Sequence, residues 1–198
     1  MKLYSYVVEH DTGYAPNPYF GVCTLCRCKY RTSRTKPRNV VELAEVGDWV
    51  VGTGGADKNK SAGHGKLVYA MRVEEKLTRQ EYHASPRFAA KKRVETGTYA
   101  QTRGDNETPR NDFEKREQFV LISRHFYYFG AGAIDIPKEA PPNLEKRGPG
   151  FRCDFAPADI CRFVEWLEKQ RDKPGKHGDP CQRSLAQPKA SKKCKSSC

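Results

Sequence analysis

The feature that most constrains the fold is the segment V-G-D-W-V-V-G-T-G-G at residues 46–55. A Gly-Asp turn pair opens the segment, and Trp49 and the two valines after it are residues that favour a buried strand. Gly52 and Gly54 follow in a glycine-rich exit, where the missing side chains let another backbone or a ligand come close. A turn, a core strand and such an exit form a suitable floor for a binding pocket. The segment holds no obvious nucleophile or metal ligand, which favours recognition over catalysis.

Other apolar segments predict strands that accompany this one. Residues 3–8 alternate and then become apolar, which predicts an opening strand. Residues 66–74 predict a strong strand that pairs antiparallel with the Trp49 strand. Residues 119–122 and 126–129 predict two further strands on either side of a polar Ser-Arg-His interruption. In the second of these, F-Y-Y-F, one face is expected in the core, and the other is expected to offer aromatic surface of the kind that stacks on bases.

Two helices are predicted beside the sheet. Thr78 and Glu81 fit a capping box, so a short helix is expected to begin there and to break before Pro86. Residues 157–169 place apolar side chains at i, i+3, i+4 and i+7, which is typical of an amphipathic helix that covers a sheet. The sequence therefore predicts an α+β fold, with a mixed, mainly antiparallel sheet and a C-terminal covering helix.

Length and charge divide the chain into a domain and a tail. The 198 residues suit one domain at residues 1–170 and a basic tail at residues 171–198, which lacks periodicity and is predicted to be disordered. The net charge of +12 is divided equally between the domain and the tail. The tail carries eight Lys and Arg against two Asp and so supplies +6. A basic body and tail favour a polyanionic partner, with DNA first and RNA or a modified nucleotide as alternatives. A solvated basic surface without a partner is the other interpretation.

The sequence indicates a soluble, cytoplasmic protein without a membrane partner. No apolar run approaches the ~20 residues needed to cross a bilayer, and the N-terminus is too polar for a signal peptide. In that compartment the eight cysteines are thiols or metal ligands rather than disulfides. Cys23 and Cys26 form a C-x-x-C pair that can occupy two corners of a zinc site, but the chain has no second such pair. Small buried thiols are therefore preferred, no metal or cofactor is predicted, and nothing in the pattern predicts an oligomeric state.

Candidate nucleic-acid contacts lie in two neighbouring segments. The stretch Y-A-P-N-P-Y-F-G at residues 14–21 is held extended by its prolines and carries Tyr14 and Phe20. These rings can stack on a base or wall a pocket, or they can cover one edge of the core. The stretch at residues 29–38 is basic and contains three arginines that can contact phosphates, Arg31, Arg34 and Arg38. A solvated loop is the alternative for this stretch.

Polar candidates for hydrogen bonding or acid–base chemistry are scattered. Residues 96–112 predict a long polar loop, and its Asp105 and Asn106 can read the edge of a base or fix a turn through their own backbone. His64 lies between two glycines before the strand at residues 66–74, and His125 lies in the polar interruption between the later strands. Either histidine can touch a ligand, although a glycine-flanked histidine is more often a surface residue.

Five motifs in order along the chain extend this interpretation: F-G-V-C-T-L, V-G-D-W-V-V-G-T-G, K-L-V-Y-A-M-R-V, G-D-N and V-L-I-S-R-H-F-Y-Y-F-G. With them the chain resembles the nucleotide modification associated domain 2 family of bacteria and their phages, from Met1 to the end of the amphipathic helix. The resemblance implies an association with modified nucleotides in DNA, either making or recognising them. The G-D-W-V-V strand is also similar, at fold level, to PUA-like and EVE domains, small barrels that hold a modified base in an aromatic pocket. This second likeness implies a PUA-like, barrel-like sheet.

The leading hypothesis is a nucleic-acid-binding module that accommodates a modified or flipped base in DNA. Its expected contacts are stacking rings, rim glycines, hydrogen-bonding groups and phosphate-binding arginines, namely Tyr14, Phe20, Trp49, Tyr128, Gly52, Gly54, Asp105, Asn106, Arg31, Arg34 and Arg38. The alternative is an enzyme that modifies a nucleotide or DNA base, with its acid–base groups or nucleophile among Asp105, His64, His125 and Cys23. A structural protein whose aromatic residues serve only the core is the third interpretation.

Overall fold

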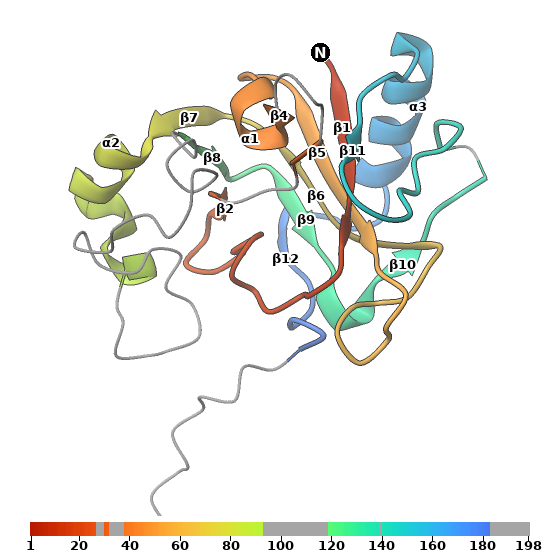
Figure 1. Cartoon of the computed structure of the whole chain (residues 1–198), viewed down its shortest axis with the longest axis horizontal. Coiled ribbons are helices and arrows are strands. Elements are labelled where there is room, and N and C mark those ends of the chain that lie inside the picture. The colour runs from red at the N-terminus through yellow and green to blue at the C-terminus, as the bar shows by residue number, and fades with distance from the viewer. Residues whose placement is uncertain (27–29, 32–37, 93–118, 139, 183–198) are drawn as a thin grey trace, which may run out of the picture.

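A computed structural model of the chain describes residues 1–26, 30–31, 38–92, 119–138 and 140–182. Its centre is a seven-stranded sheet in the order β11-β1-β5-β6-β9-β12, with β10 paired to β6 (Figure 1). The strands are β1 (Leu3–Val8), β5 (Trp49–Gly54), β6 (Lys66–Arg72), β9 (Phe126–Tyr128), β10 (Ile134–Asp135), β11 (Phe151–Arg152) and β12 (Gly175–Lys176). β5 pairs antiparallel with β6, as predicted, and parallel with β1.

A smaller sheet and a short ribbon complete the described strands. The smaller sheet has the order β2-β8-β7, and β3 pairs with β4 in the ribbon. These strands are β2 (Cys23–Leu25), β3 (Tyr30–Arg31), β4 (Arg38–Asn39), β7 (Glu75–Thr78) and β8 (Phe119–Ser123). The α+β class is confirmed, but the described strands do not close a barrel. β11 and β12 lie at opposite edges of the main sheet, and each is only two residues long, too short for an extended ladder between them.

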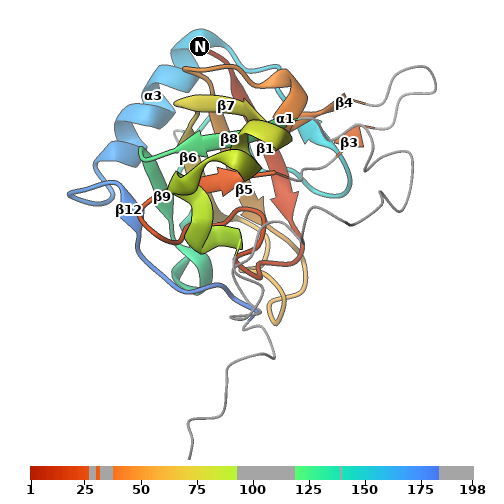
Figure 2. The same ribbon diagram turned by 90° about the vertical axis from the view of Figure 1, so that its left-hand side faces the viewer.

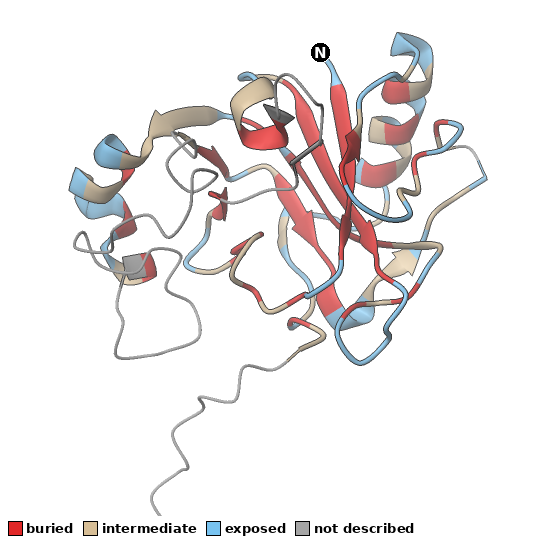
Figure 3. Ribbon diagram, viewed as in Figure 1, coloured by how far each residue is buried: buried red, intermediate tan, exposed pale blue. Residues whose placement is uncertain are grey.

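Both faces of the main sheet are buried. Along β5, Trp49 and Val51 pack in a cluster with the helix α3 (Pro157–Glu168), whereas Val50 packs in a second cluster with α1 (Val40–Leu43). This alternation follows from the period of two in a strand. Figures 1 and 2 show α3 on one side of the strands and α1 on the other, and Figure 3 shows the strands between them as buried. The predicted covering helix is therefore confirmed.

The remaining helices follow local sequence signals. α2 (Arg79–Ala84) begins at the predicted capping box, in which the Glu81 N–H donates to Thr78 Oγ1 at 3.2 Å and the Thr78 N–H donates to the Glu81 carboxylate at 2.8 Å. Two 3-10 helices follow, η1 (Pro86–Lys92) and η4 (Gly130–Gly132). Among the helices in the described ranges, none combines the length and the apolar character that crossing a membrane requires.

Residues 171–182 belong to the folded structure, so the prediction that disorder begins at residue 171 is wrong for this segment. β12 lies within it and pairs parallel with β9, placing Gly175 opposite Tyr127. The His177 N–H donates to the Tyr128 carbonyl at 2.8 Å, and the His177 ring stacks on Tyr127 with centroids 6.1 Å apart. Composition predicted disorder because the segment has few apolar residues, whereas backbone hydrogen bonds hold it to the sheet.

The chain just after β1 anchors this segment through Asp11. The Asp11 side chain is buried, and its carboxylate accepts hydrogen bonds from the Tyr128 hydroxyl and, at 3.0 Å, from the Cys181 N–H. The Asp11 carbonyl accepts a further hydrogen bond from the Gln182 N–H at 2.9 Å. Burial raises the pKa of Asp11, and the hydrogen bond from Tyr128 opposes that rise. We call these contacts the Asp11 latch.

Breaking the latch is expected to free the C-terminal segment. In Asp11→Ala, the buried Tyr128 hydroxyl loses its acceptor, so we expect unfolding to become easier by about 2 kcal/mol and amide hydrogen exchange across residues 175–182 to quicken. Exchange measured by mass spectrometry tests this, with Asp11→Asn as the control because the amide keeps an acceptor oxygen at the same place. Unchanged exchange in Asp11→Ala would show that the segment is held by its other contacts.

Candidate functional site

The candidate site is an exposed aromatic loop at residues 14–22, between β1 and β2. The Phe20 side chain is 57% exposed, and the backbone φ of Phe20 is +60°. A left-handed conformation costs a residue with a side chain about 1–2 kcal/mol, and strained residues of this kind cluster at functional sites. The Tyr19 ring lies beside Phe20, with centroids 6.4 Å apart. The loop therefore presents Phe20 to solvent, as stacking on a base would require.

A buried lysine from η1 fixes this loop. The Lys91 ammonium donates to the Asn17 carbonyl at 3.0 Å, to Asn17 Oδ1 at 2.7 Å and to the Val22 carbonyl at 2.8 Å. Lys91 is 1% exposed, and burial lowers its pKa to about 7. Sequence reasoning missed Lys91, because nothing in the run A-A-K-K-R distinguishes it from the lysine that follows. Its three hydrogen bonds hold the loop at Asn17 and at Val22, on either side of Phe20 in the sequence, so Phe20 stands on a fixed support.

The predicted cysteine candidates lie beneath the loop. Cys23 begins β2 and is fully buried, and Cys26 is also buried. Burial raises the pKa of Cys23 to about 12, an effect that the nearby Lys91 charge opposes. A cysteine nucleophile acts as a thiolate, so burial disfavours that role for Cys23. In the described ranges, no three His, Cys, Asp or Glu side chains gather as a metal ion would require, and Cys28 lies outside those ranges.

Two of the predicted stacking rings lie inside the core. Trp49 is 1% exposed and packs with α3, whereas Tyr128 is 0% exposed and packs in the cluster on the other face. Tyr127 and Phe129 are buried as well, so the prediction that one face of F-Y-Y-F forms an aromatic surface is wrong. The physical reason is that α3 covers one face of β9 and α1 with β2 covers the other. Tyr14 is half-buried and lies on the same loop as Phe20.

His125 packs against the core rather than beside another candidate acid–base group. Its ring lies edge-on to Trp49 with centroids 5.4 Å apart, and His125 Nε2 lies 3.3 Å from Glu168 Oε1 on α3. Within the described contacts, nothing joins His125 to His64 or Cys23. The structure therefore does not bring the three described acid–base or nucleophile candidates together.

The glycine-rich exit of β5 is filled by the chain itself. A Cβ atom on Gly52 would lie 2.4 Å from Cε1 of Tyr69, and one on Gly54 would lie 1.9 Å from the Gly63 carbonyl oxygen. Ser61 closes the same loop, because its hydroxyl donates to the Val8 carbonyl at 2.5 Å and accepts from the Gly55 N–H at 2.9 Å. The expected close approach at these glycines is thus made by the chain's own ring and backbone.

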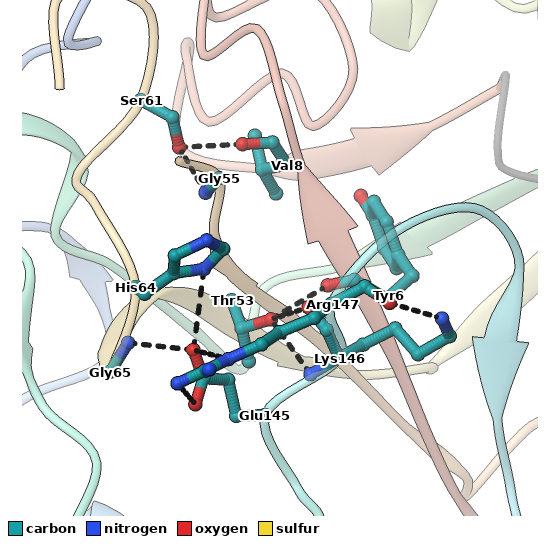
Figure 4. A network of polar contacts seen from close by, with 10 residues as sticks. All are labelled: Tyr6, Val8, Thr53, Gly55, Ser61, His64, Gly65, Glu145, Lys146 and Arg147. Atoms are coloured by element: carbon teal, nitrogen blue, oxygen red, sulfur yellow. Dashed lines mark hydrogen bonds and ion pairs between the residues drawn. The ribbon is translucent and has the colours of Figure 1, made fainter. Parts of the chain in front are cut away.

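His64 belongs to an exposed polar network at this exit (Figure 4). Its Nδ1 lies 3.4 Å from Glu145 Oε1, which also accepts a hydrogen bond from the Gly65 N–H at 2.9 Å. Arg147 Nη2 lies 3.1 Å from Glu145 Oε2, and this hydrogen bond lowers the pKa of Glu145. The network joins the loop after β5 to the segment before β11. It carries the charges of a surface ion-pair cluster and no nucleophile.

Several predicted contact residues lie wholly or partly outside the described ranges. Arg34, Asp105 and Asn106 fall outside them, and only the backbones of Arg31 and Arg38 are described. Those two backbones are opposite each other in the β3–β4 pair. The ribbon therefore brings two of the three predicted phosphate-binding positions into register.

The end of the described C-terminal segment borders the aromatic loop. The Lys176 ammonium lies 5.4 Å from the centroid of the Tyr19 ring. A Cβ atom on Gly13 would meet both Pro180, at 2.8 Å, and the Tyr19 ring, at 2.9 Å. The last described residue, Gln182, is held beside Asp11 by the latch.

Comparison with known proteins identifies the family of this chain. No curated protein and no solved structure matches it. The sequence model described as nucleotide modification associated domain 2 matches residues 1–117 and 107–187. These two matches cover the main sheet, α3 and the latched segment. The chain thus belongs to the nucleotide modification associated domain 2 family.

Proposed function

We propose that this chain is a nucleic-acid-binding module that accommodates a modified or flipped base of DNA. The observation that carries the proposal is the exposed Phe20 ring, held at positive φ on a loop that the buried Lys91 fixes. A family associated with nucleotide modification supports the same role. The PUA-like likeness belongs to this proposal as a fold-level analogy.

The energetics of the loop suit base recognition. Taking a base out of the duplex costs a few kcal/mol, least for a mismatched or damaged base, and aromatic stacking contributes about 1–3 kcal/mol per base. The backbone on either side of Phe20 is already held by Lys91, so little backbone entropy is lost when a base stacks on the ring. A ring on a rigid support can therefore offset much of the cost of extruding the base.

Basic segments flank the loop and supply the attraction for DNA. In the sequence, the arginine-rich stretch at residues 29–38 comes soon after β2, and the basic residues 183–198 follow Gln182 of the latch. In the proposal, Arg31, Arg34 and Arg38 contact phosphates, while Asp105 and Asn106 read the polar edge of the base. Phosphate contacts position the protein, and contacts to the base give preference.

Phe20→Gly is the variant that separates binding from folding. Glycine removes the ring and adopts positive φ without strain, so we expect the free energy of unfolding to stay within about 1 kcal/mol of the parent value. Affinity for an oligonucleotide that carries an unpaired or modified base is expected to fall about 10-fold or more, as the loss of one stacking contact implies. Fluorescence anisotropy with the full chain, on plain and modified oligonucleotides at two salt concentrations, measures this.

The control is Val46→Ala, which also removes an exposed apolar side chain and is expected to bind DNA like the parent. Because phosphate contacts weaken steeply with salt, the effect of Phe20→Gly should persist at the higher salt concentration. Equal affinities of Phe20→Gly and the parent for every oligonucleotide would exclude the loop as the base-binding surface.

A further inference from the structure

A second candidate site is lined by the segment that connects β10 to β11 and by Arg152 of β11, and none of its lining residues belongs to the aromatic loop. It is a cavity of about 490 Å³, a volume within the range of small-molecule sites. Its charged lining residues are Lys138, Glu145, Arg147 and Arg152, and Ile136 with three prolines supplies an apolar part of the wall.

The wall of the cavity is fixed without a ligand. The Ala140 N–H donates to the Pro137 carbonyl at 3.1 Å, and the Leu144 N–H donates to the Pro141 carbonyl at 3.0 Å. The Leu144 carbonyl accepts a hydrogen bond from the Ser5 hydroxyl of β1, and its side chain is buried in the core with α3. A wall that is already ordered lowers the entropy cost of binding.

Positive charge at the cavity is not compensated within the described residues. Among the described lining residues Glu145 is the only acidic one, and it is already bonded to Arg147 and to the Gly65 N–H. No described Asp or Glu pairs with Lys138 or Arg152, the two other lining cations. The Nε atom of Arg152 is buried and has no hydrogen-bond partner, although buried donors almost always have one. An anion in the cavity would give this donor an acceptor and would balance the positive charge.

We propose that the cavity binds the phosphate group of a free nucleotide. A guanidinium group matches phosphate oxygens in geometry, so Arg152 is the central donor, and Lys138 adds a charge from the exposed rim. The sugar and base of the nucleotide lie against the apolar wall. A cavity of this volume has room for one nucleotide, whereas the backbone of a long nucleic acid needs a continuous groove.

Calorimetric titration of the full chain with thymidine triphosphate tests the site, with thymidine as the ligand that lacks phosphate. We expect the triphosphate to bind and thymidine not to bind. Arg152→Gln is expected to weaken triphosphate binding about 10-fold or more, because a charge-assisted hydrogen bond is lost. Lys138→Gln, at an exposed position, is expected to weaken it without a change in thermal unfolding. The matched control is Arg162→Gln, an exposed arginine on α3 that should bind like the parent.

Two results would overturn the inference. One is triphosphate affinity that is the same in Arg152→Gln, Lys138→Gln and the parent. If oligonucleotide binding weakens in these variants at the same time, the cations belong to the contact with the DNA backbone. The other result is a parent chain that does not bind the triphosphate, or that binds thymidine as tightly. The inference stands apart from the proposed DNA recognition, because Phe20→Gly tests that function with a different ligand and leaves this cavity unaltered.

Discussion

Gly54→Ala is expected to lower the free energy of unfolding by about 3 kcal/mol, at the upper end of what overpacking costs. The new Cβ atom would lie 1.9 Å from the Gly63 carbonyl oxygen and 2.9 Å from its carbonyl carbon. These are backbone atoms, so no side-chain rotation relieves the clash. Gly63 has a φ of +89°, and Ser61 ties the same loop to β1, so the loop has little freedom to retreat.

Urea denaturation followed by tryptophan fluorescence measures this loss, since Trp49 on the same strand is buried in the folded state. Gly132→Ala is the matched control, because a Cβ atom there meets nothing within 4 Å. We expect that variant to unfold within about 1 kcal/mol of the parent. A Gly54→Ala protein as stable as Gly132→Ala would mean that the loop after β5 does not pack on Gly54.

Lys91→Met is expected to remove a pH-dependent gain in stability that the parent shows between pH 7 and pH 8.5. Burial lowers the pKa of Lys91 to about 7 in the folded state, whereas a lysine in an unfolded chain titrates near about 10.4. Between these values the unfolded chain holds a proton that the folded chain has released. The stability of the parent therefore rises with pH by about 1.4 kcal/mol per unit, or about 2 kcal/mol over this interval. Below pH 7 both states hold the proton, and Lys91 adds no pH dependence.

The measurement is a set of urea unfolding curves for both proteins at several pH values in this interval. It ends at pH 8.5 because thiols of the unfolded chain ionise above about that value, while burial raises the pKa of Cys23 and of Cys181 to about 12. Those thiols lower stability as pH rises, in both proteins alike. Lys169→Met, which removes an exposed lysine, should keep the slope of the parent. Parallel slopes for Lys91→Met and the parent would show that Lys91 stays charged in the folded state.

Local patterns predicted the elements whose causes are local. The β-branched run after Trp49 specified β5, the capping box specified the start of α2, and the apolar spacing specified α3. Whether the sheet closes into a barrel, and where the tail begins, depend instead on pairing between strands that are distant in the sequence. β12 forms because Gly175 and Lys176 pair with β9 through their backbones. Hydrophobic periodicity does not indicate such pairing.

The residues of the candidate site show the same difference between local and long-range causes. The exposure of Phe20 agrees with one of the two interpretations of the proline-rich loop, the one in which its rings face solvent. Trp49 and Tyr128 were assigned to a pocket from residue type alone, but layers from distant parts of the sequence cover both rings. Lys91 and Arg152 were missed because a buried cation looks like any other basic residue until its surroundings are known.

The Asp11 latch sets the order in which this protein can finish folding during synthesis. β1 leaves the ribosome first, yet the carboxylate beside it meets the Cys181 N–H only after 170 further residues have been added. Chains are synthesised at about 5–20 residues per second, so Asp11 stays free to be solvated for roughly 10 to 30 seconds, and the β12 edge of the sheet is still open when that wait nears its end. A chain shortened to residue 170 would remain permanently at that stage. Binding experiments with a shortened chain should therefore keep every residue through Gln182.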